Sequence, residues 1–303
     1  MSRRLPWLLV TGFLVTSLFG VATSSRILAA DPPQRATVPL WGESVPEPRI
    51  TGDGPETTLP DRPGSAVTRV TNIRSPYLVV FPAASDKARG AAAIVVPGGG
   101  FRYLTADLEG GEACEWLAAK GVTAFLLKHR APTNEHPEPN LAVAQDTQRA
   151  VQLVRSRASE WNLKTDRIGV LGFSAGGQAA LKAATNAPLW KDAIPATETE
   201  TRPDFLLLVY PWGLYDAKAK ALRPDLLISA KTPPTFIAQA GDDKASLPQG
   251  SALAYLKLLE SGVPAELHIY ETGGHGFGLR PSKSPATTDW TLRAADWLRT
   301  RGF

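Results

Sequence analysis

The stretch that decides the fold is Arg167-Ile168-Gly169-Val170-Leu171-Gly172-Phe173-Ser174-Ala175-Gly176-Gly177. Its apolar first half predicts a buried strand, and the small residues from Ala175 onward predict the start of a helix. A serine at so tight a junction takes strained backbone angles, and the glycines two residues before and after it avoid clashes. The strain pushes the hydroxyl out of the sheet edge, where a base can reach it. A reactive serine is therefore the first hypothesis, and the rest of the chain must supply its partners.

Strands and helices alternate on both sides of this stretch. Apolar runs predict strands at 91–96, 122–127, 167–171, 204–210, 235–240 and 265–270. Periodic segments with end signals predict helices at 108–120, 140–158, 248–261 and 287–300. This alternation predicts one α/β domain with a mainly parallel sheet and helices on both faces. Two earlier strands, 66–73 and 77–81, fit an antiparallel edge of that sheet.

The N-terminal part of the chain predicts export. Arg3 and Arg4 precede an apolar run that ends before Ala29-Ala30, so residues 1–30 are interpreted as a signal peptide. Cleavage near Ala30 would give a secreted or periplasmic protein without stable membrane association, and a retained anchor is the alternative. Residues 31–65 are dense in Pro, Gly and Thr, which predicts an extended arm before a catalytic domain at 66–303.

Composition narrows the remaining possibilities. The formal charge is +4 with no basic stripe, which argues against nucleic acid as a partner. Cys114 is the only cysteine, so no intrachain disulfide can form, and its helical context predicts a buried small side chain. We therefore expect stabilisation by an apolar core. The pattern calls for neither a metal nor a cofactor.

A serine nucleophile needs a base and an acid that orients this base. Of the four histidines, His275 lies in a glycine-rich loop after the last predicted strand, where functional groups of open α/β sheets gather. His129 and His136 precede the serine and His268 lies mid-strand, so His275 is the predicted base.

The acid is expected on a loop between Ser174 and His275. Asp242 and Asp243 directly follow the strand 235–240, and only one of two adjacent side chains can point at the imidazole. Asp243 is favoured and Asp242 stays open as the alternative. Asp204 and Asp216 are weaker candidates, because one opens a strand and the other lies in a longer excursion.

The oxyanion donors are expected from two places. One is the backbone N–H of Ala175, at the positive end of the helix that follows the serine. The other is the glycine-rich loop 97–101, which ends the buried strand 91–96. The same loop fails the Gly-x-Gly-x-x-Gly pattern of dinucleotide-binding sites.

These residues resemble secreted bacterial α/β-hydrolases of the acetyl xylan esterase and feruloyl esterase-like type. The resemblance rests on the segments 40–43, 96–101, 127–130, 167–177 and 262–278, with His129 where the family has tyrosine. It implies an α/β-hydrolase fold with an antiparallel N-terminal edge, and a triad of Ser174, Asp243 and His275. It also implies oxyanion N–H groups at Gly99, Gly100 and Ala175.

The resemblance further implies ester hydrolysis through an acyl-enzyme, with removal of acetyl groups from xylan or related carbohydrates. Trp41, Trp190 and Trp212 are candidates for a sugar platform, and Trp212 and Phe101 are the predicted substrate-binding residues. Residues 244–251 depart from the family pattern, which leaves the substrate open. A prolyl oligopeptidase-type peptidase and a non-catalytic hydrolase-fold binding protein are the alternatives.

Overall fold

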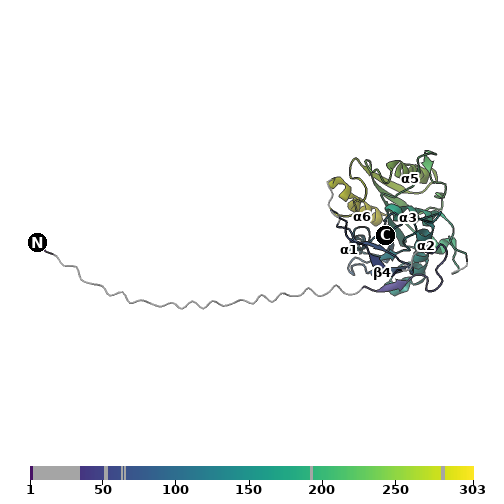
Figure 1. Ribbon diagram of the computed structural model, residues 1–303, viewed down its shortest axis with the longest axis horizontal. Coiled ribbons are helices and arrows are strands. Elements are labelled where there is room, and N and C mark those ends of the chain that lie inside the picture. The colour runs from purple at the N-terminus through teal and green to yellow at the C-terminus, as the bar shows by residue number, and fades with distance from the viewer. Residues whose placement is uncertain (3–34, 51–53, 63, 65, 192–193, 281–283) are drawn as a thin grey trace. The chain divides into compact units, whose positions relative to one another are not determined.

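The computed structural model describes residues 1–2, 35–50, 54–62, 64, 66–191, 194–280 and 284–303 (Figure 1). The chain divides into two units, Met1–Gln34 and Arg35–Phe303, and the architecture below is that of the second unit. The predicted signal peptide, apart from Met1 and Ser2, lies outside the described residues. Among the described helices, none has the length and apolar character needed to cross a membrane.

One eight-stranded sheet forms the centre of the second unit. In spatial order its strands are β1 (Thr37–Pro39), β4 (Tyr77–Phe81), β7 (Val122–Lys128), β5 (Ala91–Val96), β8 (Ile168–Phe173), β9 (Leu206–Val209), β12 (Thr235–Ala240) and β13 (Ala265–Tyr270). From β7 to β13 each strand runs parallel to its neighbours. β4 is antiparallel to β7, and β1 is antiparallel to β4. This is the predicted α/β-hydrolase architecture, with its antiparallel N-terminal edge.

Helices cover both faces of the sheet. The helices are α1 (Glu112–Ala119), α2 (Leu141–Ser156), α3 (Ser174–Thr185), the short α4 (Glu198–Thr201), α5 (Pro248–Glu260) and α6 (Trp290–Thr300), with single turns at Asp107–Gly111, Ala158–Trp161 and Pro285–Asp289. Figure 1 shows α1 and α6 on one side and α2 and α3 on the other. Successive residues of β5 alternate between two apolar cores, one beneath α2, α3 and α5 and the other beneath α1 and α6. Burial on both faces explains why this strand is apolar throughout.

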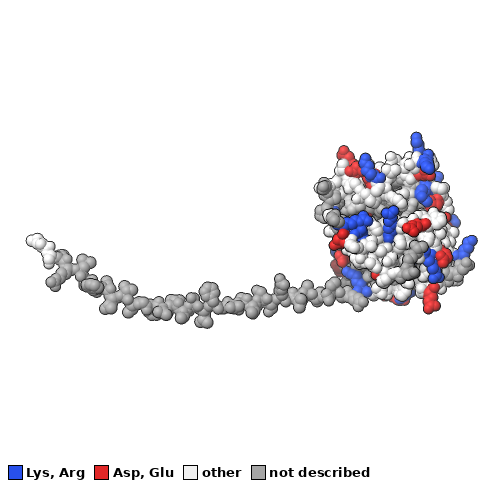
Figure 2. All heavy atoms as spheres, in the orientation of Figure 1, with Lys and Arg blue, Asp and Glu red and all other residues white. Residues whose placement is uncertain are grey.

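Cys114 is fully buried in the core beneath α1, as its sequence context predicts. Figure 2 shows Lys and Arg interspersed with Asp and Glu on one face of the domain. The exposed charges of that face therefore do not form a patch of one sign.

The outer edge of the sheet differs from the sequence-based prediction. The strand expected at 66–73 is β3 (Arg69–Thr71), and it pairs with β2 (Thr57–Thr58) and β6 (Leu104–Thr105) in a separate three-stranded sheet. The edge strand is β1, which comes from the expected arm. β4 pairs with β7 on one side, so its other row of backbone groups needs a partner, and β1 supplies it. A small hairpin of β10 (Tyr215–Asp216) and β11 (Ala221–Leu222) completes the strands of the described residues.

The segment that follows β1 is held by a buried ion pair. Arg130 and Asp146 lie 2.9 Å apart with no exposed side-chain surface. Trp41 Nε1 donates to Asp146 Oδ1 at 2.7 Å, and Arg130 donates to the carbonyls of Pro46 and Pro48. These contacts join the described part of the expected arm, from Arg35 onward, to α2.

Candidate active site

Ser174 is the first residue of α3 and directly follows β8. Its φ of +49° is rare for a residue with a side chain, and it is the strained angle that the sequence predicts for this turn. A Cβ on Gly172 would lie 2.7 Å from the Gly176 carbonyl oxygen, and one on Gly176 would lie 2.2 Å from that of Val96. Both positions therefore require glycine.

His275 lies on the loop after β13 and reaches the serine. Its Nε2 is 2.9 Å from Ser174 Oγ, and its Nδ1 is 2.8 Å from Asp243 Oδ2. The imidazole side chain is 29% exposed, whereas the carboxylate is fully buried. With Nδ1–H donating to the carboxylate, Nε2 is free to accept the serine proton. The structure thus brings together three residues that are widely separated in the sequence.

Asp243 is the carboxylate at the imidazole. Its Oδ1 accepts from the N–H groups of Ala245 and Ser246, both at 2.8 Å. Burial opposes ionisation, but these bonds and the one from His275 outweigh it and hold the pKa of Asp243 below its ordinary value. Asp242 instead accepts from the Gly274 N–H at 2.7 Å, so it braces the histidine loop from outside.

The two weaker acid candidates are engaged elsewhere. Asp204 is paired with Arg155 at 2.9 Å. Asp216 accepts from the N–H groups of Lys218 and Ala219 in the β10–β11 turn. Neither carboxylate contacts the imidazole.

The glycine loop lies directly against the serine. A Cβ on Gly98 would be 2.7 Å from Ser174 Cβ, and one on Gly99, whose φ is +130°, would be 1.9 Å from the Tyr103 carbonyl oxygen. Within the described residues, the N–H groups of Gly99, Gly100 and Ala175 donate to no protein acceptor. Ala175 is in the first turn of α3, where N–H groups lack helical partners. Unpaired donors beside a serine hydroxyl suit a developing oxyanion.

A cleft of about 640 Å³ opens over Ser174 and His275, and Gly99, Gly100, Phe101 and Trp212 line it. Trp212 is 37% exposed, and its ring meets the buried Phe101 ring edge-on at 6.0 Å. A neighbouring hollow of about 560 Å³ continues beyond these two rings. Both predicted substrate-binding residues therefore lie at the cleft.

The other two tryptophans of the expected sugar platform do not reach the cleft, and their predicted role is wrong. Trp41 and Trp190 are 4% and 6% exposed and pack edge-on against each other at 5.0 Å. Their indole N–H groups donate to Asp146 and to the Ile194 carbonyl. Both side chains are packed in the core beside α2.

Comparison with known proteins agrees with the fold. The family model BD-FAE matches residues 79–200. The acetyl ester-xyloside bifunctional hydrolase of Caldicellulosiruptor lactoaceticus superposes with a TM-score of 0.67 and 30% identity, over 91% of this chain and 99% of that one. The chain belongs to the α/β-hydrolase esterase family.

Three further relatives of this esterase-family chain are known from sequence. The acetylxylan esterase of Xylanibacter ruminicola is 29% identical over 64% of this chain and 42% of its own length. Esterase LipI of Mycobacterium tuberculosis is 26% identical over 72% of this chain and 75% of its own length. Endo-1,4-beta-xylanase B of Butyrivibrio fibrisolvens is 26% identical over 63% of this chain and 33% of its own length. The chain therefore spans less than half the length of the acetylxylan esterase and of this xylanase.

Sequence reasoning missed one buried pair of this α/β-hydrolase. Glu109 accepts from the Gly98 N–H at 2.9 Å and from the Tyr210 hydroxyl at 2.9 Å. The Tyr210 oxygen in turn accepts from the Gly278 N–H at 3.2 Å. Burial raises the pKa of Glu109. The pair links the glycine loop to the histidine loop, and no local spacing signals it, because Glu109 reads as an ordinary residue at a helix start.

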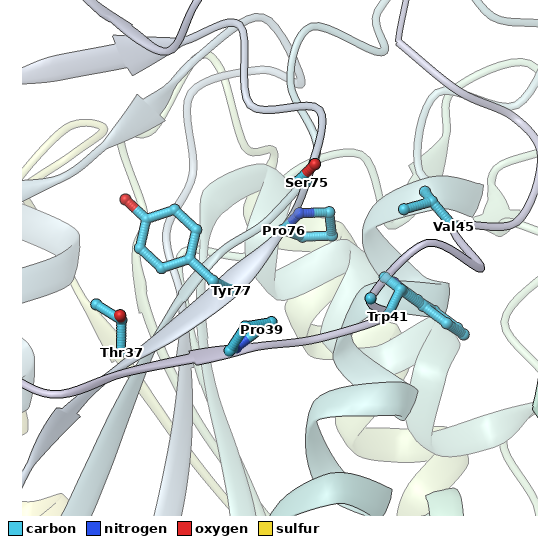
Figure 3. Close-up of a pocket in the computed structure, with 8 residues that line it drawn as sticks. Thr37, Pro39, Trp41, Val45, Ser75, Pro76 and Tyr77 are labelled. Atoms are coloured by element: carbon cyan, nitrogen blue, oxygen red, sulfur yellow. The ribbon is translucent and has the colours of Figure 1, made fainter.

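A separate hollow of about 420 Å³ lies beside β1 and the start of β4. Figure 3 shows residues that line it. Residues Thr37, Pro39, Trp41, Gly42, Val45, Ser75, Pro76 and Tyr77 line it. Ser174, Asp243 and His275 do not line this hollow, so it is not part of the candidate site. Within the described residues, no three His, Cys, Asp or Glu side chains are grouped as a metal site requires.

Proposed function

We propose that the protein is a serine carboxylic-ester hydrolase that works through an acyl-enzyme. The observation that carries the proposal is the continuous relay from Ser174 Oγ through His275 to Asp243, with contacts of 2.9 and 2.8 Å. Esterase activity in relatives of the same family supports it.

In the proposed reaction, His275 Nε2 accepts the Ser174 proton as Oγ attacks the ester carbonyl. The N–H groups of Ala175, Gly99 and Gly100 hold the oxyanion, and Asp243 stabilises the imidazolium that forms. The imidazolium then protonates the departing alcohol. Water attacks the acyl-enzyme with His275 again as the base, which releases the acid and restores the serine.

We further propose acetyl groups on xylan or a related carbohydrate as the substrate. Two relatives whose names include acetylxylan or an acetyl ester-xyloside support this assignment. The exposed face of Trp212 at the cleft suits a sugar ring, since apolar sugar faces pack on aromatic rings.

The decisive test is Ser174→Ala, with Ser85→Ala as a matched control at an exposed position outside the cleft. Loss of the nucleophile should lower kcat for p-nitrophenyl acetate by about 10⁴-fold or more, and the control should keep it. A labelled fluorophosphonate should modify the wild-type protein and not Ser174→Ala. Unchanged acetate hydrolysis by Ser174→Ala would sink the mechanism.

A substrate panel separates the remaining functions. Acetylated xylan, acetylated simple sugars, feruloyl esters and short p-nitrophenyl esters should be compared with a proline-containing peptide. Acetyl esters should be cleaved fastest. Preferential peptide cleavage would favour the peptidase alternative, and failure of both fluorophosphonate labelling and ester cleavage would favour a binding protein.

We also propose export, from the signal-like residues 1–30 and a catalytic domain that follows them. The mass of the secreted protein from a bacterial host checks this. Cleavage near Ala30 is expected, and an intact N-terminus held at the membrane would point to an anchor.

A further inference from the structure

Three arginines are among the residues that line the cleft over Ser174 and His275: Arg62, Arg69 and Arg102. The part of the cleft that they line is called its arginine side. Arg102 belongs to the same loop as Gly99 and Gly100. The guanidinium carbons of Arg62 and Arg69 lie 5.6 and 5.7 Å from the centre of the Tyr103 ring. The guanidinium groups of Arg62 and Arg69 therefore both lie near the Tyr103 ring, and Tyr103 directly follows Arg102 in the chain.

These arginines lack acidic partners in the described part of the chain. None of the three forms an ion pair with a described carboxylate, whereas Arg130, Arg155 and Arg280 all do. Arg69 is 8% exposed, and it donates through Nη2 to the Pro60 carbonyl. Its buried Nε has no partner within the structure described.

The remaining titratable groups at the cleft form no described ion pair with these arginines. The carboxylate among the lining residues is Glu109, which is 4% exposed and is occupied by Gly98 and Tyr210. His275 and Tyr103 also line the cleft. Like charges gathered around one ring repel each other, and a bound anion removes that repulsion.

We propose that the arginine side of the cleft binds a carboxylate carried by the alcohol part of the ester, so that the substrate is an acetylated acidic saccharide such as one containing a uronic acid. This inference rests on the proposed esterase function. An acetyl group fills only a small part of a cleft of about 640 Å³, which leaves the arginine side to the alcohol. Guanidinium groups present paired N–H donors that match the two oxygens of a carboxylate.

The test begins with binding, which needs no turnover. Methyl glucuronoside and methyl glucoside differ by a carboxylate in place of a hydroxymethyl group, and their affinities for Ser174→Ala can be compared by NMR titration. The glucuronoside should bind about tenfold more tightly at low salt. Its advantage should shrink as salt is raised, because Arg62 and Arg102 are exposed to screening.

Kinetics on the wild-type protein form the second arm. The monoacetates of the same two glycosides should show the same preference in kcat/KM. The double variant Arg62→Gln/Arg102→Gln should lose most of this preference in kcat/KM and, when combined with Ser174→Ala, in the NMR titration. Both of these side chains are exposed, so the fold should tolerate the change. Arg89→Gln, at an exposed position before β5 and so at the opposite end of the strand from the cleft, is the matched control and should keep it.

The two arms separate the two proposals. Equal or weaker binding of the glucuronoside overturns this inference, even if both acetates are cleaved. Tighter binding of the glucuronoside that the double variant retains also overturns it, because the arginines would then not be the cause. Tighter binding that depends on the arginines, without cleavage of any acetate by the wild type, would support carboxylate binding at the arginines and contradict the proposed esterase.

Discussion

Asp242 and Asp243 are neighbours with the same side chain, yet they do different things. The Asp243 carboxylate is fully buried and contacts His275 Nδ1, whereas Asp242 is exposed and accepts from the Gly274 N–H. Of these two adjacent residues, Asp243 therefore orients the imidazole, and Asp242 holds the loop that carries it.

Asp243→Asn should lower kcat for p-nitrophenyl acetate by about 10³- to 10⁴-fold, because an amide favours the wrong imidazole tautomer and cannot stabilise the imidazolium. Asp242→Asn, the matched control, should cost only a few-fold. Steady-state kinetics on both purified variants check this. An equal loss in the two variants would contradict the assignment of Asp243.

Gly176 offers a second prediction at a single residue. An added Cβ would lie 2.2 Å from the Val96 oxygen and 2.6 Å from the Pro97 oxygen, and backbone atoms cannot retreat easily. Gly176→Ala should therefore lower the free energy of unfolding by about 2–4 kcal/mol. Gly111→Ala is the control, since its Cβ would meet the Ala106 oxygen at an ordinary 3.7 Å. Urea titrations that give both variants the same midpoint would refute the steric argument.

Among the elements, the glycine loop after β5 and the histidine loop after β13 are joined through the Glu109–Tyr210 pair. The Tyr210 hydroxyl donates to Glu109 and accepts from the Gly278 N–H, so it links the two loops through hydrogen bonds. The Tyr210 ring also meets the His275 ring edge-on at 5.1 Å. We therefore expect both residues to act by positioning the glycine loop and His275.

Tyr210→Phe should lower kcat about tenfold with little change in KM, because small displacements of positioned groups are costly in rate. Tyr270→Phe removes a buried hydroxyl that has no partner in the described structure, so it is a matched control that should leave kcat unchanged. Steady-state assays with p-nitrophenyl acetate measure kcat and KM for both variants. A purely structural role would appear as lost stability in Tyr210→Phe with normal kcat in the folded fraction.

For the whole molecule, Asp225 couples stability to pH. It accepts from Arg223 at 3.0 Å, Asn140 at 3.1 Å and Lys182 at 3.0 Å, which connects the loop before β12 to the start of α2 and to α3. Burial opposes its ionisation, but these hydrogen bonds outweigh it and lower the pKa of Asp225 to about 2.

A depressed carboxyl pKa stabilises the folded state above the unfolded pKa of 3.8, and this contribution is lost as pH falls toward about 2. After allowance for solvent screening, we expect a contribution of about 1 kcal/mol. The free energy of unfolding should therefore fall by about that much more for the wild type than for Asp225→Asn between pH 5 and pH 2.5. Denaturant titrations at both pH values measure the difference, and identical pH slopes would contradict it.

Much of the fold was predictable from local patterns. Strands β5, β12 and β13 match the predicted ranges 91–96, 235–240 and 265–270. β5 is an uninterrupted apolar run, and the other two are short segments bounded by turn residues such as Pro234, Gly241 and Pro264. The edge was not predictable, since β1 is only three residues long and its pairing with β4 joins segments about 40 residues apart. The burial of Trp41 was not predictable either, because it depends on packing against α2, about 100 residues further along the chain.

By itself, the sequence determined the serine at its glycine-flanked turn, the histidine on a glycine-rich loop and the order of strands and helices. Those features follow from local sterics and periodicity. Only the tertiary structure decided that Asp243 meets the imidazole, that Glu109 and Tyr210 join two loops, and that three arginines line the same cleft. Each of these depends on contacts between residues distant in the chain, and such contacts form only when the sheet brings its loops together.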